Sequence, residues 1–314
     1  MPSPFPPPRA HAEVGATSTG ALEILESQAI FVLREIASEC RRPALMFSGG
    51  KDSAVLLHLA VKAFRPGTIP FPLLHVDTGQ NFPEVLQFRD RRAQETGCAL
   101  VVESVEEGLQ RGWLGDSNHL SSRNQLQAPA LLHAVGAHAF DALFGGARRD
   151  EDKARAKERI ISHRTREGRW DPENQRPELW DLYHAELRPG EHLRVFPLSD
   201  WTELDVWRYI EQEGIELPPL YFSHERDVLV RDDMLMAVSE WVQPGTGERS
   251  QRLSVRFRTV GDASCTGAIR SRATTVAEVI REISASRISE RGATRADDRF
   301  SDSAMEDRKR QGYF

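Results

Sequence analysis

The stretch SGGKDS, residues 48–53, combines two glycines, one ammonium group and two hydroxyl groups. A glycine-rich turn that leads into a helix offers an anion unpaired backbone N–H groups and the positive end of the helix dipole. Gly49 and Gly50 permit unusual dihedral angles and a close approach of the backbone to the anion. Lys51 adds a full positive charge, and Ser48 and Ser53 add hydroxyl donors. These residues predict a phosphate-binding turn.

Two better-known phosphate-binding patterns do not describe this stretch. A Walker A loop needs glycine at position 45 and Ser or Thr after the lysine, where this chain has Leu45 and Asp52. No GxGxxG fingerprint of a dinucleotide site occurs in the chain. Two roles are open to Asp52, a helix cap or a partner of Mg²⁺ beside the phosphates, and we favour the cap. A tight turn with no ligand is the alternative for the whole stretch.

A second anion-binding segment is predicted at FGGARRDE, residues 144–151. Gly145 and Gly146 are expected to shape an anion site, and Arg148 and Arg149 follow them directly. Guanidinium groups match tetrahedral oxyanions with paired hydrogen bonds, so both arginines are candidates for binding such an anion. Lys153 is a second choice for this role. Arg155 and Lys157 belong to a run of mixed charges, which is typical of a solvated helix face.

The elements that must position these residues alternate between strands and helices. Short apolar runs predict five strands, at residues 44–47, 73–76, 100–102, 142–144 and 193–196. Helical patterns between most of them predict a doubly wound, mostly parallel α/β sheet. Ligands bind such sheets beyond the carboxyl ends of the strands. Asp77 ends the second strand there, so it is expected at the ligand site, with a simple turn aspartate as the alternative.

Three segments are expected along the chain. Residues 1–20 are rich in proline and small residues, which predicts a disordered tail. Residues 21–221 carry the α/β pattern and form the predicted catalytic domain. Residues 222–314 show a weaker, charged pattern with one helix near residues 275–283. This C-terminal extension is interpreted as part of the same unit and as a surface that docks a partner, together with the N-terminal helix.

Composition narrows the class of protein. The net charge of −6 and the pI near 6.0 give no indication of a nucleic-acid partner. No apolar run reaches the roughly 18 residues of a membrane helix, and no signal peptide is apparent. The three cysteines are Cys40, Cys98 and Cys265, and none of them, nor any of the ten histidines, has metal-ligand spacing. We therefore expect a reducing, cytoplasmic location and no resident metal, and we interpret the histidines as structural.

The turn at residues 48–53 resembles the PP-loop of the ATP pyrophosphatase superfamily, which cleaves ATP between its α and β phosphates. Further segments resemble the small subunits of bacterial sulfate adenylyltransferases. They are PFPLLHVDTG (70–79), FGGARRDEDKARAKERI (144–160), RWDPENQRPELW (169–180), RVFPLSDWTELDVWRYI (194–210) and KRQGYF (309–314). The resemblance covers roughly residues 22–314.

This resemblance implies the reaction of ATP with sulfate to give adenosine 5′-phosphosulfate and diphosphate, the first step of sulfate assimilation. It implies Mg²⁺ as part of Mg-ATP and no tightly bound cofactor. It implies catalysis by Lys51, Arg148 and Arg149, and nucleotide binding by residues 48–53, Asp77, Gly145 and Gly146. The family couples its reaction to GTP hydrolysis in a large GTPase subunit, and this chain has no GK[ST] triplet of its own.

Three other functions are considered. A phosphoadenylylsulfate or adenylylsulfate reductase shares the fold but uses a C-terminal cysteine, whereas no cysteine follows Cys265. Another PP-loop chemistry, such as RNA base modification, has no basic surface or glutamine-hydrolysing module to support it. A catalytically idle nucleotide-binding regulatory subunit is disfavoured by the intact SGGKDS and GGARRDE segments.

Overall fold

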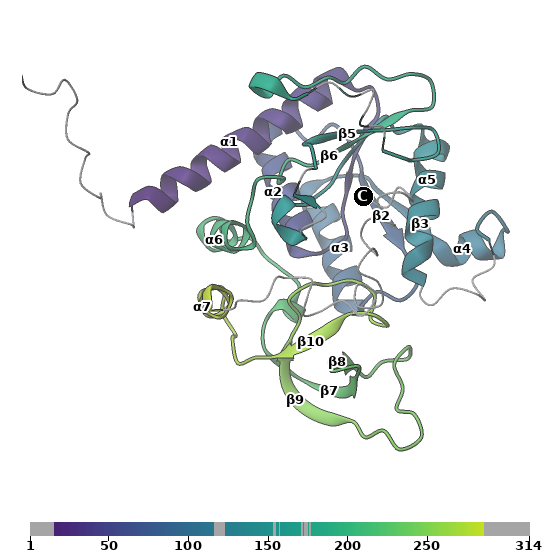
Figure 1. The fold of residues 1–314 in the computed structure, drawn as a ribbon, viewed down its shortest axis with the longest axis vertical. Coiled ribbons are helices and arrows are strands. Elements are labelled where there is room, and N and C mark those ends of the chain that lie inside the picture. Colours follow the sequence, from purple (N-terminus) through teal and green to yellow (C-terminus); the bar gives the residue numbers. More distant parts are fainter. Residues whose placement is uncertain are drawn as a thin grey trace, which may run out of the picture.

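The computed structural model describes residues 16–115, 123–152, 155–156, 158–170, 172, 175 and 177–285. Its centre is a six-stranded sheet with the order β3-β2-β1-β4-β6-β5 (Figure 1). The strands of this sheet are β1 (Pro43–Met46), β2 (Leu73–Asp77), β3 (Leu100–Ser104), β4 (Ala142–Phe144), β5 (Ile161–Arg164) and β6 (His192–Val195).

The five predicted strands are confirmed as the five parallel strands of this sheet, β1, β2, β3, β4 and β6. The expected count of five was one too low, because β5 adds an antiparallel strand at the edge, beside β6. Strand β5 has the sequence ISHR, and its single strongly apolar residue gives no apolar run. The strand order changes direction at β1, so that β4 follows on its other side. The carboxyl ends of β1 and β4 lie at the same edge of the sheet, called the crest below, which is where ligands bind in this architecture.

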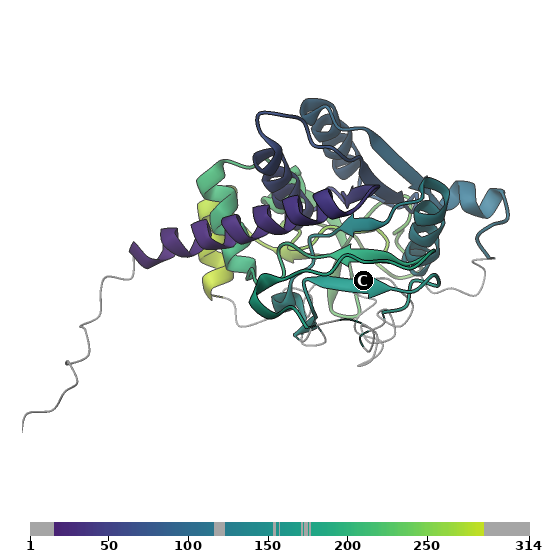
Figure 2. The same cartoon turned by 90° about the horizontal axis from the view of Figure 1, so that it is seen from above.

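Helices cover both faces of the sheet (Figures 1 and 2). The main apolar core joins one face to α1, α2, α3, α6 and α7, and smaller clusters join the other face to α4 and α5. The α-helices are α1 (Ala16–Glu39), α2 (Lys51–Phe64), α3 (Pro83–Thr96), α4 (Val105–Gln110), α5 (Gln127–His138), α6 (Glu203–Glu213) and α7 (Val276–Ala285). In α2 nine of the fourteen residues are buried, as expected for a helix packed along a sheet.

The C-terminal extension contains a small closed barrel of four antiparallel strands, which the weak sequence pattern did not predict (Figure 1). They are β7 (His224–Arg231), β8 (Met234–Ala237), β9 (Gln251–Arg256) and β10 (Gly267–Arg270). The barrel shares an apolar cluster with the start of α3, in which Phe82 and Val85 pack with Val255 and Phe257. This shared core fixes the extension against the crest of the central sheet.

The chain ends lie largely outside the described residues. Helix α1 begins at Ala16, so the helix starts inside the range 1–20 that was expected to be a tail. Residues 1–15 and 286–314, including the KRQGYF segment, are outside the described part of the chain. Within the described residues, no helix has the length and apolar character to span a bilayer.

Candidate active site

The SGGKDS stretch forms a tight turn between β1 and α2, as the sequence predicts. Helix α2 begins at Lys51, directly after Gly50 as its N-cap. Gly49 has φ +76°, and a Cβ there would lie 2.7 Å from Cγ1 of Val85, so both the backbone conformation and the contact with α3 require glycine. The Ser53 hydroxyl donates to the Gly50 carbonyl at 2.9 Å, and the Gly50 N–H donates to the Ser48 hydroxyl at 3.3 Å.

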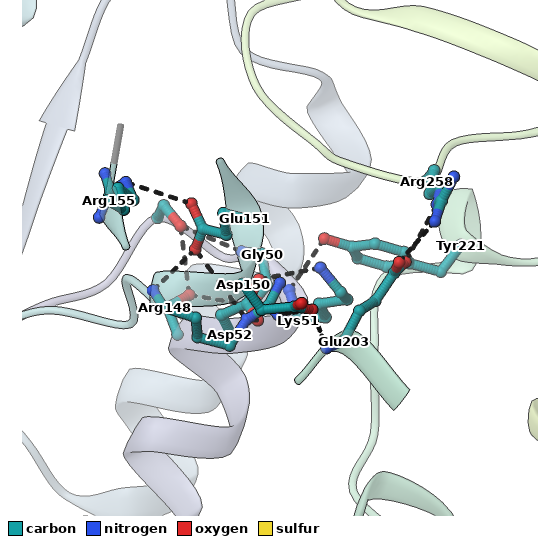
Figure 3. A network of polar contacts seen from close by, with 12 residues as sticks. Gly50, Lys51, Asp52, Arg148, Asp150, Glu151, Arg155, Glu203, Tyr221 and Arg258 are labelled. Carbon is teal, nitrogen blue, oxygen red and sulfur yellow. Dashed lines mark hydrogen bonds and ion pairs between the residues drawn. The ribbon is translucent and has the colours of Figure 1, made fainter. Parts of the chain in front are cut away.

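Lys51 is fully buried at the start of α2 (Figure 3). Its backbone N–H donates to the Tyr221 hydroxyl at 2.8 Å, although the two residues are far apart in the sequence. Its ammonium group donates to Asp52 at 3.0 Å. A buried cation at a helix N-terminus is a favourable place for a polyanion, because the helix dipole and the full charge act in the same direction.

Asp52 lies between two cations. One of its oxygens is 3.0 Å from Nζ of Lys51, and the other accepts from Nε of Arg148 at 2.8 Å (Figure 3). Burial by itself would raise the pKa of Asp52, but the charges of Arg148 and Lys51 lower it below its usual value. Asp52 makes no side-chain capping bond to the start of α2. The cap that the sequence favoured for Asp52 is therefore wrong, because its carboxylate is directed to Lys51 and Arg148.

A cavity of about 280 Å³ opens at this crest of the sheet. Its wall includes Ser48, Gly50, Lys51, Asp52, Ser53 and Gly146 of the predicted site residues. The same wall contains Met46, His75, Asn81, Arg155, Tyr221 and residues 259–262. The phosphate-binding turn, the end of β4 and the C-terminal extension therefore meet around one space.

The extension completes the cavity through the loop at residues 259–262. Asp262 is fully buried and accepts from the Thr78 hydroxyl at 2.7 Å. The Ala263 N–H donates to the Gln80 carbonyl at 2.8 Å. These bonds join the loop to the turn after β2, which is far away in the sequence. The extension was expected to be part of the same unit and to dock a partner, and its part in this wall is a further finding.

Asp77 and Gly145 are not in the cavity wall. Asp77 accepts from the Gly79 N–H at 2.8 Å and lies 3.7 Å from a guanidinium nitrogen of Arg89. It therefore holds the turn after β2, which is the simpler of its two predicted roles. A Cβ on Gly145 would lie 2.8 Å from Cε of Met46, so this glycine leaves room for the Met46 side chain.

Arg148 and Arg149 have separate surroundings. Arg148 is buried behind Asp52, whereas the Arg149 side chain is 30% exposed and pairs with Asp200. Nε of Arg149 also donates to the Glu158 carbonyl at 2.7 Å. Arg149 was expected to face the anion with Arg148, but the backbone at Arg148 is extended, and successive side chains of an extended chain point to opposite sides. In this structure Arg148 positions Asp52 and Lys51, and Arg149 braces the loop.

Arg155 was interpreted as part of a solvated helix face, and this interpretation is wrong. Its side chain is 1% exposed and borders the cavity. It pairs with Glu158 at 3.3 Å and lies 3.7 Å from Glu151 (Figure 3). The expected contact of Glu151 with Arg155 does form, but Arg155 lies in a 3₁₀ turn and is buried, so it is not part of a solvated helix face. Lys153 and Lys157 lie outside the described residues.

His75 also borders the cavity, although it belongs to no motif that the sequence shows. Its Nδ1 lies 2.8 Å from the Phe47 carbonyl, which can only accept, so Nδ1 carries a proton. Burial, the largest influence, lowers the pKa of His75 and keeps the ring neutral. Nε2 is then an acceptor, and within the described chain it is buried without a hydrogen-bond partner. It can accept from a hydroxyl or amino group of a ligand.

A second buried ion pair supports the turn from the side of the extension. Arg258 holds Glu203 with two hydrogen bonds, of 2.6 and 3.1 Å (Figure 3). Burial by itself would raise the pKa of Glu203, but the hydrogen bonds of Arg258 and the charge of Lys51 lower it. The Glu203 N–H, at the start of α6, donates to Asp150 at 2.9 Å. The α6 start, the extension and the GGARRDE segment are thereby joined beside Lys51.

The arrangement suits transfer of a phosphoryl-type group by positioning and charge neutralisation. It offers a backbone turn, a buried ammonium group and the buried guanidinium group of Arg155 around one cavity. Within the described residues, no three His, Cys, Asp or Glu side chains are grouped as metal ligands. Cys265 is buried and contacts Asn124 and the Asp262 carbonyl through its sulfur.

Comparisons with known proteins identify relatives of this chain. Residues 42–268 match the family of phosphoadenosine phosphosulfate reductase domains. The chain is 58% identical to sulfate adenylyltransferase subunit 2 of Mycolicibacterium gilvum, over 93% of this chain and 94% of the relative. It is 57% identical to the Streptomyces lavendulae protein of the same name, over 93% and 92%. A solved structure of Candida glabrata FMN adenylyltransferase with ATP is similar at a TM-score of 0.46 and 15% identity, covering 72% of this chain and 68% of that one.

The fold and site thus define a nucleotide-binding α/β protein of the PP-loop class, within the phosphoadenosine phosphosulfate reductase domain family. Within that class, the chain belongs to the sulfate adenylyltransferase subunit 2 family. It is therefore an enzyme subunit of the nucleotidyltransferase kind, and the predicted family is confirmed. The name "subunit 2" of the relatives implies a partner subunit.

Proposed function

We propose that this chain is the catalytic subunit that joins ATP and sulfate to give adenosine 5′-phosphosulfate and diphosphate. The observation that carries the proposal is the fully buried Lys51 at the start of α2, in the wall of the cavity. A buried ammonium group beside a glycine turn suits the β and γ phosphates, which leave together as diphosphate.

In the proposed reaction, an oxygen of sulfate attacks the α-phosphorus. A new P–O bond forms, the bond from the α-phosphorus to the α–β bridging oxygen breaks, and diphosphate leaves with the electron pair. No proton has to move, because sulfate is already an anion. The chain's task is to hold two mutually repelling anions in line and to neutralise the charge that develops on the leaving group. Mg²⁺ enters with ATP as part of the substrate and reduces the same repulsion.

The turn at residues 48–53 holds the leaving diphosphate in this proposal. Asp52 and Arg148 fix the ammonium group of Lys51 through the contacts of 3.0 and 2.8 Å. His75 and the Thr78–Asp262 contact lie on the β2 side of the cavity, where the nucleoside is proposed to bind. The product is a mixed anhydride of high energy, so the reaction needs a driving force. We propose that GTP hydrolysis in the partner subunit supplies it, as the family resemblance implies.

The test is the exchange of labelled diphosphate into ATP, measured with the chain alone and with its partner subunit. The proposal predicts exchange that requires sulfate, and net product formation that rises when the partner and GTP are added. Exchange that proceeds equally without sulfate would contradict the proposed acceptor. Product formation that is fast and independent of GTP would contradict only the proposed coupling. Release of sulfite with an added thiol would instead favour the reductase alternative.

A further inference from the structure

Two arginines of the β5–β6 edge are buried without carboxylate partners of their own. Arg194 is fully buried and Arg164 is 2% exposed. Among the described residues, Nη2 of Arg194 and both Nε and Nη1 of Arg164 have no hydrogen-bond partner. Buried guanidinium groups are normally paired, because leaving such donors unsatisfied is costly. Their presence therefore needs an explanation other than stability.

The strand register places these arginines on one face of the sheet. Arg194 lies opposite Ser162 and Arg164 lies opposite His192, so the two arginines are diagonal neighbours. Burial, followed by their mutual repulsion, lowers the pKa of Arg194 to about 9. Burial together with the two arginine charges lowers the pKa of His192 to about 2, so the histidine adds no positive charge. The positive charges of Arg194 and Arg164 are thus held close together and away from solvent.

This pair adjoins the cavity. Nη1 of Arg194 contacts Sδ of Met46 at 3.2 Å, and Met46 is part of the cavity wall. A thioether is a weak acceptor, and an anion would bind the same N–H far more strongly. Arg155 borders the cavity at this end, and its charge also lowers the pKa of Arg164, after the larger effect of burial. The absence of a side chain at Gly145 gives Met46 its space.

Among the described residues, the carboxylates near this pair lie on Arg155 and Arg164. Glu151 and Glu158 both face Arg155, and Glu158 also attracts Arg164. No ion pair of the described residues includes Arg194, whose contacts are a thioether and a histidine. The three arginines Arg155, Arg164 and Arg194 are called the arginine nest below.

We propose that the arginine nest binds the acceptor dianion of the reaction, so that sulfate sits at the Arg155 end of the cavity and Arg194 exchanges Met46 Sδ for a sulfate oxygen. This inference rests on the proposed function and names the residues that bind its second substrate. Guanidinium groups carry donors only, so the nest suits an oxyanion whose four oxygens all accept, such as sulfate or selenate. The nest reaches the cavity wall through Met46, which ends β1 just before the SGGKDS turn.

The test compares Arg194→Met and Arg194→Lys with the wild-type chain, each assembled with its partner subunit. Sulfate-dependent exchange of labelled diphosphate into ATP is measured over a range of sulfate and of ATP concentrations. Loss of charged hydrogen bonds to the anion predicts that Arg194→Met raises the KM for sulfate about 10- to 100-fold, while the KM for ATP stays within about twofold. Arg194→Lys keeps the charge without the fork, so it should raise the KM for sulfate less.

The matched control is Arg256→Met, which removes an equally buried arginine of the barrel that is paired with Glu282 at 2.9 Å. This control should lower the thermal stability and leave the KM for sulfate unchanged. Arg194→Met should instead leave the melting temperature of the sulfate-free chain unchanged or raise it, because a buried like charge is removed. Arg164→Gln provides a second, independent variant with the same expected rise in the KM for sulfate.

Two results would overturn the inference. One is a KM for sulfate within about twofold of wild type in Arg194→Met and Arg164→Gln. The other is an equal rise in the KM for sulfate and for ATP, with a lower melting temperature, which would mark the arginines as structural. Both results presuppose a wild-type enzyme whose exchange requires sulfate. Failure of the wild-type reaction itself would contradict the proposed function, so the two failures are distinguishable.

Discussion

Two buried arginines near the cavity differ in how their charge is balanced. Arg148, beside the SGGKDS turn, has the carboxylates of Asp52, Asp150 and Glu151 at 2.8, 3.6 and 4.0 Å. Arg194, on β6, contacts a thioether and a neutral histidine instead. The charge of Arg148 is matched by carboxylates, whereas no carboxylate of the described residues pairs with Arg194.

This difference separates two uses of a buried guanidinium group. An arginine that positions other residues brings its own carboxylates, because breaking such a pair is costly. An arginine that binds an anionic ligand has to leave its donors to that ligand. The difference therefore predicts opposite responses when the two kinds of arginine are removed, and the variants below are chosen to break or sharpen it.

The largest effect is expected from Lys51→Ala. Loss of the buried ammonium group removes the main charge that stabilises the leaving diphosphate, so sulfate-dependent exchange should fall roughly 100- to 1,000-fold. The control is Lys62→Ala in the same helix, whose ammonium group pairs with Glu26 at 2.7 Å and Glu213 at 3.1 Å outside the cavity wall. It should retain near wild-type exchange. Activity of Lys51→Ala within about threefold of wild type would favour a merely structural turn.

The contrast between the two arginines is sharpest for Arg148→Met. This change removes one cation from Asp52, which keeps Lys51, and one from Glu151, which keeps Arg155. Breaking a buried pair in this way costs about 3–5 kcal/mol of unfolding free energy. Urea unfolding measures this quantity, and Arg194→Met provides the comparison, with no loss expected. Equal losses in the two variants would remove the distinction between positioning and ligand-binding arginines.

A smaller effect is expected from Gly146→Ala. A Cβ at this position would lie 3.0–3.2 Å from the Asp52 backbone and side chain, so the start of α2 has to shift. Stability should fall by about 1–3 kcal/mol, with a parallel drop in exchange. Gly136→Ala in α5 meets no atom within 4 Å and should raise stability by roughly 0.5–1 kcal/mol. If Gly146→Ala were as stable as Gly136→Ala, the start of α2 would tolerate the shift, which contradicts this prediction.

The smallest effect is a pH dependence carried by Glu203. Its folded-state pKa lies below the ordinary value of 4.5, because Arg258 and Lys51 outweigh burial. The stabilisation is therefore fully present above pH 4.5 and is lost as the pH falls through the lowered pKa. Glu203→Gln should be less stable than wild type at neutral pH, and the gap should narrow once the pH falls below that ordinary value. A gap that stays constant from neutral pH into the acid range contradicts this ionisation.

The parallel sheet and the SGGKDS turn could be predicted from the sequence because their signals are local. Apolar runs gave β1, β2, β3, β4 and β6, and a glycine turn between a strand and a helix indicated phosphate binding. The barrel escaped detection because its longest strand, β7, has the sequence HERDVLVR, which begins with four polar residues and includes an exposed valine, Val230. Only Val228 and Leu229 of this strand are buried, so its apolar pattern is weak.

The rest of the site could not be predicted, because it depends on contacts between distant parts of the chain. Tyr221, Asp262 and His75 have no motif around them, and only the fold brings them to the cavity. Arg155 was misread because its charged neighbours suggested a solvated face, whereas the fold buries its side chain beside Glu151 and Glu158. Arg149 was paired with Arg148 on sequence adjacency, while the extended backbone directs the two side chains apart.

The most direct measurement of the central claim is a structure of the chain with a non-hydrolysable ATP analogue and selenate, whose selenium is located by anomalous scattering. The account predicts the β and γ phosphates on the turn at residues 48–53, beside Lys51. It predicts one selenium peak at the Arg155 end of the same cavity, within hydrogen-bonding reach of Arg194. Phosphates bound away from Lys51, or selenium on the far side of the nucleotide from the arginine nest, would contradict it.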